Sequence, residues 1–345
     1  MKNKTKLTLV GAGLGAALAV RAVQKRREIS FTGRSVVITG GSRGLGLVLA
    51  RELAREGARL ALLARDPAEL DRARQDLAAV GAEVVTIPCD VTYRAQTEQA
   101  IEQVAGRYES IDVLINNAGV IQTGPLEHMT LQDFADAMAV HFWGPLHTML
   151  AAVPHMRRQG GGRIVNISSI GGKLAVPHLA PYSASKFALT GLSDGMRAEL
   201  AKDNIRVTTV CPGLMRTGSH LNALFKGQHQ AEFTWFSLLD SLPLTSIDAR
   251  RAARQIIEAC RRGSPQLIIT VQARLAAAAA ALFPSLTAEA MALVNRLLPG
   301  PAAAPGDEAR TGWESQSDWA PSLLTRLADE ATAENNELRG HPPVA

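Results

Sequence analysis

The chain has 345 residues, an apolar fraction of 46% and 29 glycines, which indicate a globular α/β protein and exclude wholesale disorder. Its net charge is +5, but the first 27 residues hold seven basic residues and no acidic one, so the remainder carries −2. This distribution argues against a nucleic-acid partner and points to a membrane surface or a targeting signal at the N-terminus.

The three cysteines, Cys89, Cys211 and Cys260, are an odd number without the spacing of a metal site. We expect them to be reduced thiols in a protein on the cytoplasmic side of the cell. The sequence shows no cluster of histidine, cysteine and carboxylate residues that suggests a metal.

Residues 7–20 form an uncharged apolar run between two basic clusters, shorter than the ~20 residues that a helix needs to cross a bilayer. A cleaved signal peptide is one interpretation, since residues 17–19 have a small-x-small form. A dinucleotide turn at 11–16 is a second, but the next strand ends in another turn instead of a ribose-selecting residue. We favour a third, in which residues 1–30 are a membrane-associating or targeting segment.

Residues 35–39 predict a β-branched strand, followed by a glycine-rich turn over 40–46 and a helix. Glycines let the backbone approach a pyrophosphate, and the helix N-terminus supplies free amides. A glycine pattern alone is weak evidence, but this one stands between strand and helix, where the function requires it.

The second predicted strand, 59–63, ends in Ala64-Arg65-Asp66. An acidic residue closing this strand would bind a ribose 2′-hydroxyl, whereas an arginine suits a 2′-phosphate. Alternatively, Arg65 merely pairs with a carboxylate such as Glu69, one helical turn on. We favour NADP(H) over NAD(H) because the arginine fork matches phosphate.

Further strands are predicted at 84–88, 113–115 and 164–167, and a long helix at 131–156. The strand at 164–167 delivers Ser168 and Ser169 to the carboxyl edge of the sheet, where open α/β sheets bind ligands. Tyr182 and Lys186 stand one turn apart on the helix that follows.

A nearby ammonium favours the phenolate of Tyr182 and lowers its pKa from ~10, which makes it a usable general acid or base. Ser169 could hydrogen-bond the oxygen on which charge develops. Tyr182 and Lys186 alone could be an ordinary surface pair. The serines, the tyrosine–lysine pair and the glycine turn together fit one mechanism.

With these motifs, residues 31–270 resemble the short-chain dehydrogenase/reductase family. The resemblance implies a Rossmann-type, doubly wound α/β fold of three layers with a seven-stranded parallel sheet, in a domain over 31–272. It implies catalytic roles for Ser169, Tyr182 and Lys186, and adenine contacts from Asp90 and Val91. The cofactor-binding residues implied are Thr39, Gly40, Ser42, Arg43, Gly44, Leu45, Gly46, Arg65, Asp90, Val91, Asn117, Ala118, Gly119, Tyr182, Lys186, Pro212, Gly213 and Thr217.

The sequence departs from the family at His141, where most members carry the asparagine of a catalytic tetrad. In the family, the backbone carbonyl of that asparagine holds a water linked to the lysine, and a histidine still offers its carbonyl. Alternatively, the imidazole joins the proton relay, or the site is impaired. We expect retained activity and include His141 among the catalytic residues, because the serine, tyrosine and lysine are present.

Residues 218–244 look loop-like and hold four aromatic residues at the family's substrate-lid position. The aromatics either line a lipophilic substrate site or cover the core. A helix at 247–262 and a strand at 266–270 complete the sheet. Residues 273–300 predict an apolar helical extension that packs on the sheet, contacts a second subunit or lies on a membrane. Residues 301–345 hold 8 acids against 3 bases and predict a flexible tail with at most a short helix near 323–330.

We therefore expect an NADP(H)-dependent oxidoreductase that moves hydride between nicotinamide and a carbonyl or secondary alcohol of a small lipophilic substrate. By resemblance it would be a homo-oligomer, with a membrane surface as a further partner through residues 1–30. The alternative is a non-catalytic NAD(P)-binding regulatory or redox-sensing protein on the same fold. An epimerase or dehydratase is less favoured, because the lid shows no obvious second acid/base pair.

Overall fold

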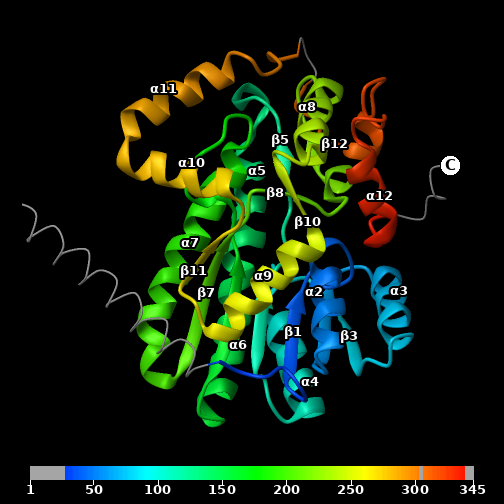
Figure 1. Cartoon of the computed structure of the whole chain (residues 1–345), viewed down its shortest axis with the longest axis vertical. Helices are drawn as coiled ribbons and strands as arrows, with labels where there is room; N and C mark the ends of the chain where they lie inside the picture. The colour runs from blue at the N-terminus through cyan, green and yellow to red at the C-terminus, as the bar shows by residue number, and fades with distance from the viewer. Residues whose placement is uncertain (1–27, 303–305, 339–345) are drawn as a thin grey trace, which may run out of the picture.

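A computed structural model of the chain describes residues 28–302 and 306–338. Its centre is the seven-stranded parallel sheet that was predicted (Figure 1), and the strands follow the order β11-β7-β6-β4-β1-β2-β3. The strand order reverses between β1 and β4, which is the switch point where doubly wound sheets bind ligands. The strands are β1 (Ser35–Thr39), β2 (Arg59–Ala64), β3 (Val84–Pro88), β4 (Val113–Asn116), β6 (Gly162–Ile167), β7 (Ile205–Cys211) and β11 (Gln266–Ile268).

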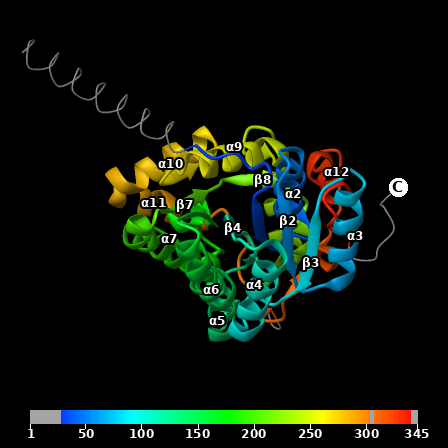
Figure 2. The ribbon, with the colours of Figure 1, turned by 90° about the horizontal axis from the view of Figure 1, so that it is seen from below.

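The central strands are buried along almost their whole length and are largely apolar, because both faces of the sheet are covered by helices. One apolar cluster joins the sheet to α2, α3 and α9, and a second joins it to α4, α6 and α7. The two groups lie on opposite sides of the sheet (Figure 2). The helices are α2 (Gly44–Arg55), α3 (Pro67–Ala78), α4 (Arg94–Tyr108), α6 (Gly144–Arg158), α7 (Ala180–Leu200) and α9 (Ala249–Arg262).

The long helix expected over 131–156 is interrupted. It consists of α5 (Leu131–Met138), a five-residue π-helical turn η2 (Ala139–Trp143) and α6. Such wide turns are rare and often mark functional sites. Here the turn carries His141, whose side chain is 1% exposed.

The lid is more regular than its sequence suggests. It forms η5 (Ser219–Asn222), β9 (Leu224–Phe225) and α8 (His229–Ser241) instead of a loop. Phe233 and Phe236, spaced one helical turn apart, pack against Phe225 and bury that side of the helix. The aromatics that looked like loop residues therefore form a small apolar core of their own.

The prediction of a flexible tail is wrong for residues 306–338. Here β12 (Arg310–Thr311) pairs with β9, which also pairs with β5 (Gln122–Thr123), and α12 (Arg326–Glu334) follows. Acidic residues that suggested a solvated tail have basic partners, as in the Arg250–Glu334 and Arg43–Glu337 pairs. In Figure 1, α12 lies above α2 and α3, near the carboxyl ends of the strands.

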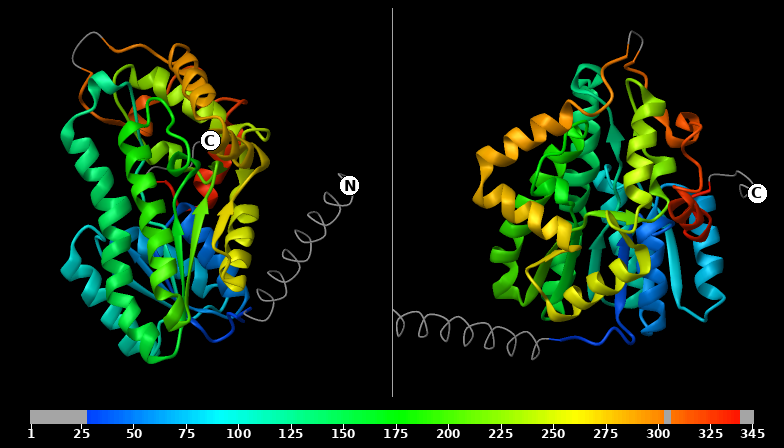
Figure 3. Two further views of the ribbon diagram at one scale, coloured as in Figure 1. Left: turned by 90° about the vertical axis from the view of Figure 1, so that its left-hand side faces the viewer. Right: turned by 45° about the horizontal axis from the view of Figure 1, so that its top comes forward.

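The apolar extension is a hairpin of two helices, α10 (Val271–Leu282) and α11 (Pro284–Asn295), which projects from the body (Figure 3). Most of its large apolar side chains are exposed, so packing on the sheet is not its main role. No helix among residues 28–302 and 306–338 is long and apolar enough to cross a membrane. Residues 7–20 lie outside the described residues, and membrane association stays a prediction.

The three cysteines are free and buried. Cys89 follows β3, Cys211 closes β7 and Cys260 belongs to α9. Burial raises the pKa of Cys211 to about 11 and that of Cys260 to about 12.

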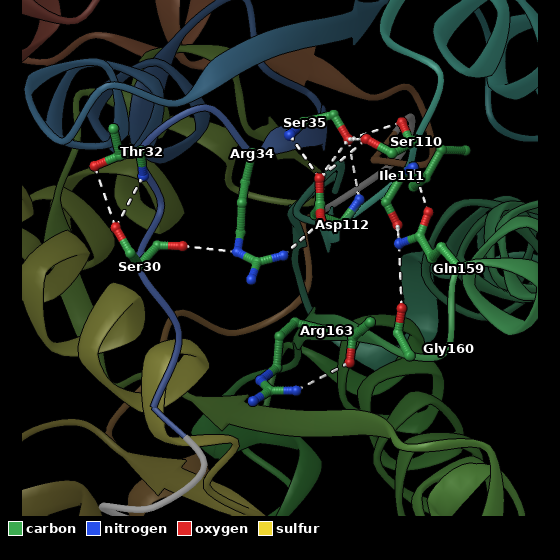
Figure 4. A network of polar contacts seen from close by, with 12 residues as sticks. Ser30, Thr32, Arg34, Ser35, Ser110, Ile111, Asp112, Gln159, Gly160 and Arg163 are labelled. Atoms are coloured by element: carbon green, nitrogen blue, oxygen red, sulfur yellow. Dashed lines mark hydrogen bonds and ion pairs between the residues drawn. The ribbon is translucent and has the colours of Figure 1, made fainter.

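Asp112 ties together the amino ends of β1 and β4 (Figure 4). Its carboxylate pairs with Arg34 at 2.6 Å and accepts hydrogen bonds from the Ser35 amide at 3.0 Å and from the Ser35 and Ser110 hydroxyls, both at 3.1 Å. The Asp112 amide in turn donates to the Ser35 hydroxyl at 3.0 Å. Because Ser35 is fully buried, removing the carboxylate leaves polar groups without partners.

Asp112→Ala should therefore lower the free energy of unfolding by about 2 to 3 kcal/mol, measured by urea denaturation. Asp136→Asn is the matched control, because Asp136 is exposed and bonds only Gln132 among the described residues. The control should change stability by less than about 0.5 kcal/mol. Equal effects of the two substitutions would contradict a structural role for the Asp112 network.

Candidate active site

A cavity of about 1200 Å³ opens at the carboxyl ends of the strands, between the glycine turn and the lid. Most residues predicted from sequence line it; the exceptions are Thr39, which closes β1, and Gly46, in the first turn of α2. The lining includes Gly40, Ser42, Arg43, Gly44, Leu45, Arg65, Asp90, Val91, Asn117, Ala118, Gly119, His141, Ser169, Tyr182, Lys186, Pro212, Gly213 and Thr217. Residues from six strand ends are thus brought to one crevice.

Ser169 and Tyr182 lie together in this cavity. The Ser169 hydroxyl accepts a hydrogen bond from the Gly171 amide at 3.0 Å and is hydrogen-bonded to the Tyr182 hydroxyl. A Cβ on Gly171 would lie 3.2 Å from the Tyr182 ring, so a glycine there leaves room for the tyrosine. The neighbouring Ser168 is turned inward instead, where its hydroxyl bonds Thr190 at 2.9 Å.

Lys186 lies behind the tyrosine. Its Nζ donates to the Ile167 carbonyl at 2.9 Å and is 5.6 Å from the centroid of the Tyr182 ring. Burial lowers the pKa of Lys186 to about 7, so much of its positive charge is lost at neutral pH.

The pKa of Tyr182 moves opposite to the predicted direction. Burial raises it, and the hydrogen bond from Ser169 offsets only part of that rise. The sequence argument counted the neighbouring ammonium but not the cost of forming a phenolate away from water. In the chain alone, Tyr182 is therefore a neutral phenol at physiological pH.

The glycine turn is clamped to the end of β4. The Thr39 hydroxyl accepts from the amides of Asn117 and Ala118, and Asn117 Nδ2 donates to the carbonyls of Thr39 and Gly40, all at 3.0–3.1 Å. A Cβ on Gly46 would lie 2.0 Å from the Gly40 carbonyl oxygen, so only glycine fits. The turn and the N-terminus of α2 have the backbone form of a cradle for a pyrophosphate, although the Gly44 amide donates to the Asn335 carbonyl in this structure.

Glu69 does not pair with Arg65, the alternative that the sequence left open. Its carboxylate accepts from the Ser42 hydroxyl at 3.0 Å and lies 3.5 Å from Arg43 Nε. Arg65 is exposed at the rim of the cavity, where it can meet a ligand.

A sequence model described as "short chain dehydrogenase" matches residues 34–224, more than half of the chain. A Drosophila melanogaster protein named "Dehydrogenase/reductase SDR family protein 7-like" is 34% identical over 268 residues, 76% of this chain and 80% of that one. The chain belongs to the short-chain dehydrogenase family.

Other relatives of this short-chain dehydrogenase act on small molecules. Gluconate 5-dehydrogenase of Gluconobacter oxydans is 35% identical over 188 residues, 54% of this chain and 73% of that one. The solved structure of L-sorbose reductase from Gluconobacter frateurii, complexed with NADPH and L-sorbose, superposes with a TM-score of 0.63 at 25% identity. That likeness covers 70% of this chain and 97% of that chain. The chain is an oxidoreductase of this family.

His141 in this short-chain dehydrogenase is held at both ring nitrogens. Nε2 accepts from the Val120 amide at 3.1 Å, so Nδ1 must carry the proton and donate to the Ser185 hydroxyl at 2.8 Å. Ser185 in turn donates to the Tyr182 carbonyl at 2.8 Å. The ring connects the cavity floor to the tyrosine helix and has no nitrogen free for a proton relay.

The sequence missed three polar residues of the cavity, namely Asn222, Asp240 and Glu337. The two interpretations of the lid aromatics each hold for part of the set. Phe225 and Phe233 are buried in the lid core, Trp235 lines the cavity, and Phe236 belongs to the core and also reaches the cavity. Helical spacing within 229–241 could have separated Trp235 from Phe233 and Phe236, which lie one turn apart. No local signal marks Glu337.

The pKa of His141 lies well below its ordinary 6.5, chiefly through burial. In the unfolded chain this group gains a proton below about pH 6.5 while the folded chain does not, so its stability contribution is lost as pH falls. From this group alone, wild type should lose about 1.4 kcal/mol of unfolding free energy per pH unit below 6.5.

His141→Asn should remove this contribution, so that the unfolding free energy falls less steeply with decreasing pH, by the slope that corresponds to one proton. Urea denaturation at pH values from 5.0 to 7.5 measures both slopes. Parallel losses in both proteins would show that His141 is not held neutral by the fold.

Proposed function

We propose that the chain is an NADP(H)-dependent oxidoreductase that interconverts a carbonyl group and a secondary alcohol on a lipophilic substrate. The observation that carries the proposal is the hydrogen-bonded pair of Ser169 and Tyr182 hydroxyls beside the glycine turn, within one cavity. Two hydroxyls that meet at one point can hold one substrate oxygen between them.

In this proposal Tyr182 passes a proton to or from the substrate oxygen, and Ser169 orients that oxygen. A nicotinamide cofactor supplies or accepts the hydride and, when oxidised, brings a positive charge. Lys186, with a pKa of about 7, exchanges its proton at physiological pH and would hold the cofactor's ribose. His141 acts as a positioning residue, because both nitrogens of its ring are engaged and the ring fixes the helix that carries Tyr182.

The preference for NADP(H) rests on the basic groups at the cofactor end of the cavity. Arg43 and Arg65 match the basic positions of NADP-preferring family members, and Ala64 stands where NAD-preferring members carry an acid. Both arginines line the cavity, and Arg65 is exposed at its rim. The NADPH in the L-sorbose reductase complex supports the same preference.

A lipophilic substrate is supported by the walls on the lid side, which are mostly apolar. They include Val120, Ile121, Val176, Leu179, Leu214, Met215, Leu224, Trp235, Phe236 and Leu239. A sugar or sugar acid would leave its hydroxyls without partners against such walls. This chain therefore differs in substrate from the gluconate and sorbose enzymes that it resembles.

A regulatory NAD(P)-binding protein is the second candidate, favoured by His141 and by a carboxylate, that of Glu337, at the glycine turn. NADPH consumption with a panel of aliphatic ketones and 3-oxoacyl thioesters separates the two. An enzyme consumes NADPH with at least one of them, whereas a sensor binds NADPH without turnover.

Tyr182→Phe removes the proton donor and keeps the ring. Turnover with the best ketone of that panel should fall about 10²- to 10⁴-fold while the Kd for NADPH stays within twofold. Tyr93→Phe is the matched control, because Tyr93 is 60% exposed and outside the cavity lining. Unchanged turnover in Tyr182→Phe would remove the mechanism.

Arg65→Ala tests the cofactor preference. The Kd for NADPH should rise about ten- to a hundredfold, because a charge-assisted bond to the 2′-phosphate is lost, and the Kd for NADH should stay the same. Arg94→Ala, which removes an arginine exposed on α4, should change neither. An equal loss for both cofactors would exclude Arg65 as the phosphate-selecting residue.

A further inference from the structure

The end of the described chain lies on the glycine turn. The Gly44 amide donates to the Asn335 carbonyl at 2.8 Å, and Asn336 Nδ2 donates to the Ser42 carbonyl at 2.8 Å. Between these two, Arg43 Nη1 lies 3.1 Å from Glu337 Oε2. Three successive residues of the turn are thus engaged by Asn335–Glu337, which we name the C-terminal strap.

The Glu337 carboxylate stands where a phosphate would bind. A Cβ on Gly44, which has a φ of +54°, would lie 2.5 Å from Glu337 Oε1. Gly44 is the first residue of α2, and a helix N-terminus attracts carboxylates and phosphates for the same reason. Glu337 is only 3% exposed, so its carboxylate is buried against the N-terminus of α2 and does not lie on the surface above it.

The strap is also held from the lid side. Asn222 Nδ2 donates to Glu337 Oε2 at 2.6 Å and to the Glu337 carbonyl at 3.0 Å. Asn335 Nδ2 donates to the Thr217 carbonyl at 3.3 Å. The strap therefore spans from the proposed phosphate cradle to Thr217, the two places that the cofactor itself would connect.

The fit is incomplete. Arg43 Nη1 and Asn222 Oδ1 are buried without a hydrogen-bond partner among the described residues, although the arginine keeps its ion pair. Burial also raises the pKa of Glu337, against the opposing effects of Arg43 and Asn222. A phosphate, with more oxygens and more charge, would satisfy the Arg43 guanidinium better, whereas Asn222 Oδ1, an acceptor, would still need a donor.

We propose that the C-terminal strap is an internal competitor for the phosphate groups of the cofactor, so that the strap must leave the turn before NADP(H) binds. The inference rests on the proposed function. It follows that the apparent Kd for the cofactor equals the intrinsic Kd divided by the fraction of chains in which the strap is released. NADP(H) should displace the strap better than NAD(H), because its extra phosphate can recruit Arg43.

Two substitutions in the strap test this in the full chain. Glu337→Gln removes the charge and keeps the shape, and Asn336→Ala removes the bonds to the Ser42 and Glu69 carbonyls. Each should lower the Kd for NADPH about tenfold in a fluorescence titration. Glu330→Gln, which removes an exposed acid on α12 away from the turn, should leave the Kd unchanged.

Hydrogen–deuterium exchange supplies a readout that does not depend on turnover. Saturating NADPH should speed exchange in peptides that cover Asn335–Glu337. Slower exchange on NADPH binding would overturn the proposal, because the strap would then cover the cofactor. An unchanged Kd in both strap variants would overturn it as well.

The same measurements keep the two proposals apart. NADPH binding and Tyr182-dependent turnover with an unaltered Kd in the strap variants would reject the strap alone. Failure of wild type and of Glu337→Gln to bind either NADPH or NADH would reject the proposed function and the strap together.

Discussion

The site depends on one constraint, the clamp between β1 and β4 at their carboxyl ends. The Thr39 hydroxyl receives two successive amides from the end of β4, and the Asn117 side chain returns two bonds to the glycine turn. Asp112 closes the same two strands at their amino ends. The strand order reverses between β1 and β4, which places the ligand crevice at their carboxyl ends. The two sets of hydrogen bonds therefore fix the two strands that border the crevice in which every proposed catalytic residue lies.

Desolvation sets the chemistry inside the crevice more than pairwise charge does. Burial raises the pKa of Tyr182, lowers that of Lys186 to about 7 and keeps His141 neutral. All three shifts favour uncharged groups, so the chain alone holds few charges at the point of reaction. A charged cofactor would change this balance most where Tyr182 and Lys186 meet.

The sheet, the glycine turn and the tyrosine–lysine pair could be predicted because each produces a short local pattern in the sequence. The strands appear as β-branched runs, the turn as glycines between a strand and a helix, and the pair as a four-residue spacing. The strap could not be predicted, because Glu337 and its partner Arg43 are separated by almost the whole length of the chain. An acidic, proline-containing stretch does not indicate which residue it will contact. The direction of the Tyr182 shift was missed for a related reason, since burial depends on the complete fold.

The buried cysteines have a practical consequence. Burial keeps Cys211 and Cys260 protonated far above neutral pH, and the thiolate is the form that alkylating reagents and peroxides attack. Cys211 and Cys260 should therefore be inert in the folded enzyme, whereas Cys89, whose pKa burial also raises, lines the cavity. A cysteine introduced on the surface would be more reactive than these two, so spectroscopic probes can be attached to it without first replacing Cys211 or Cys260.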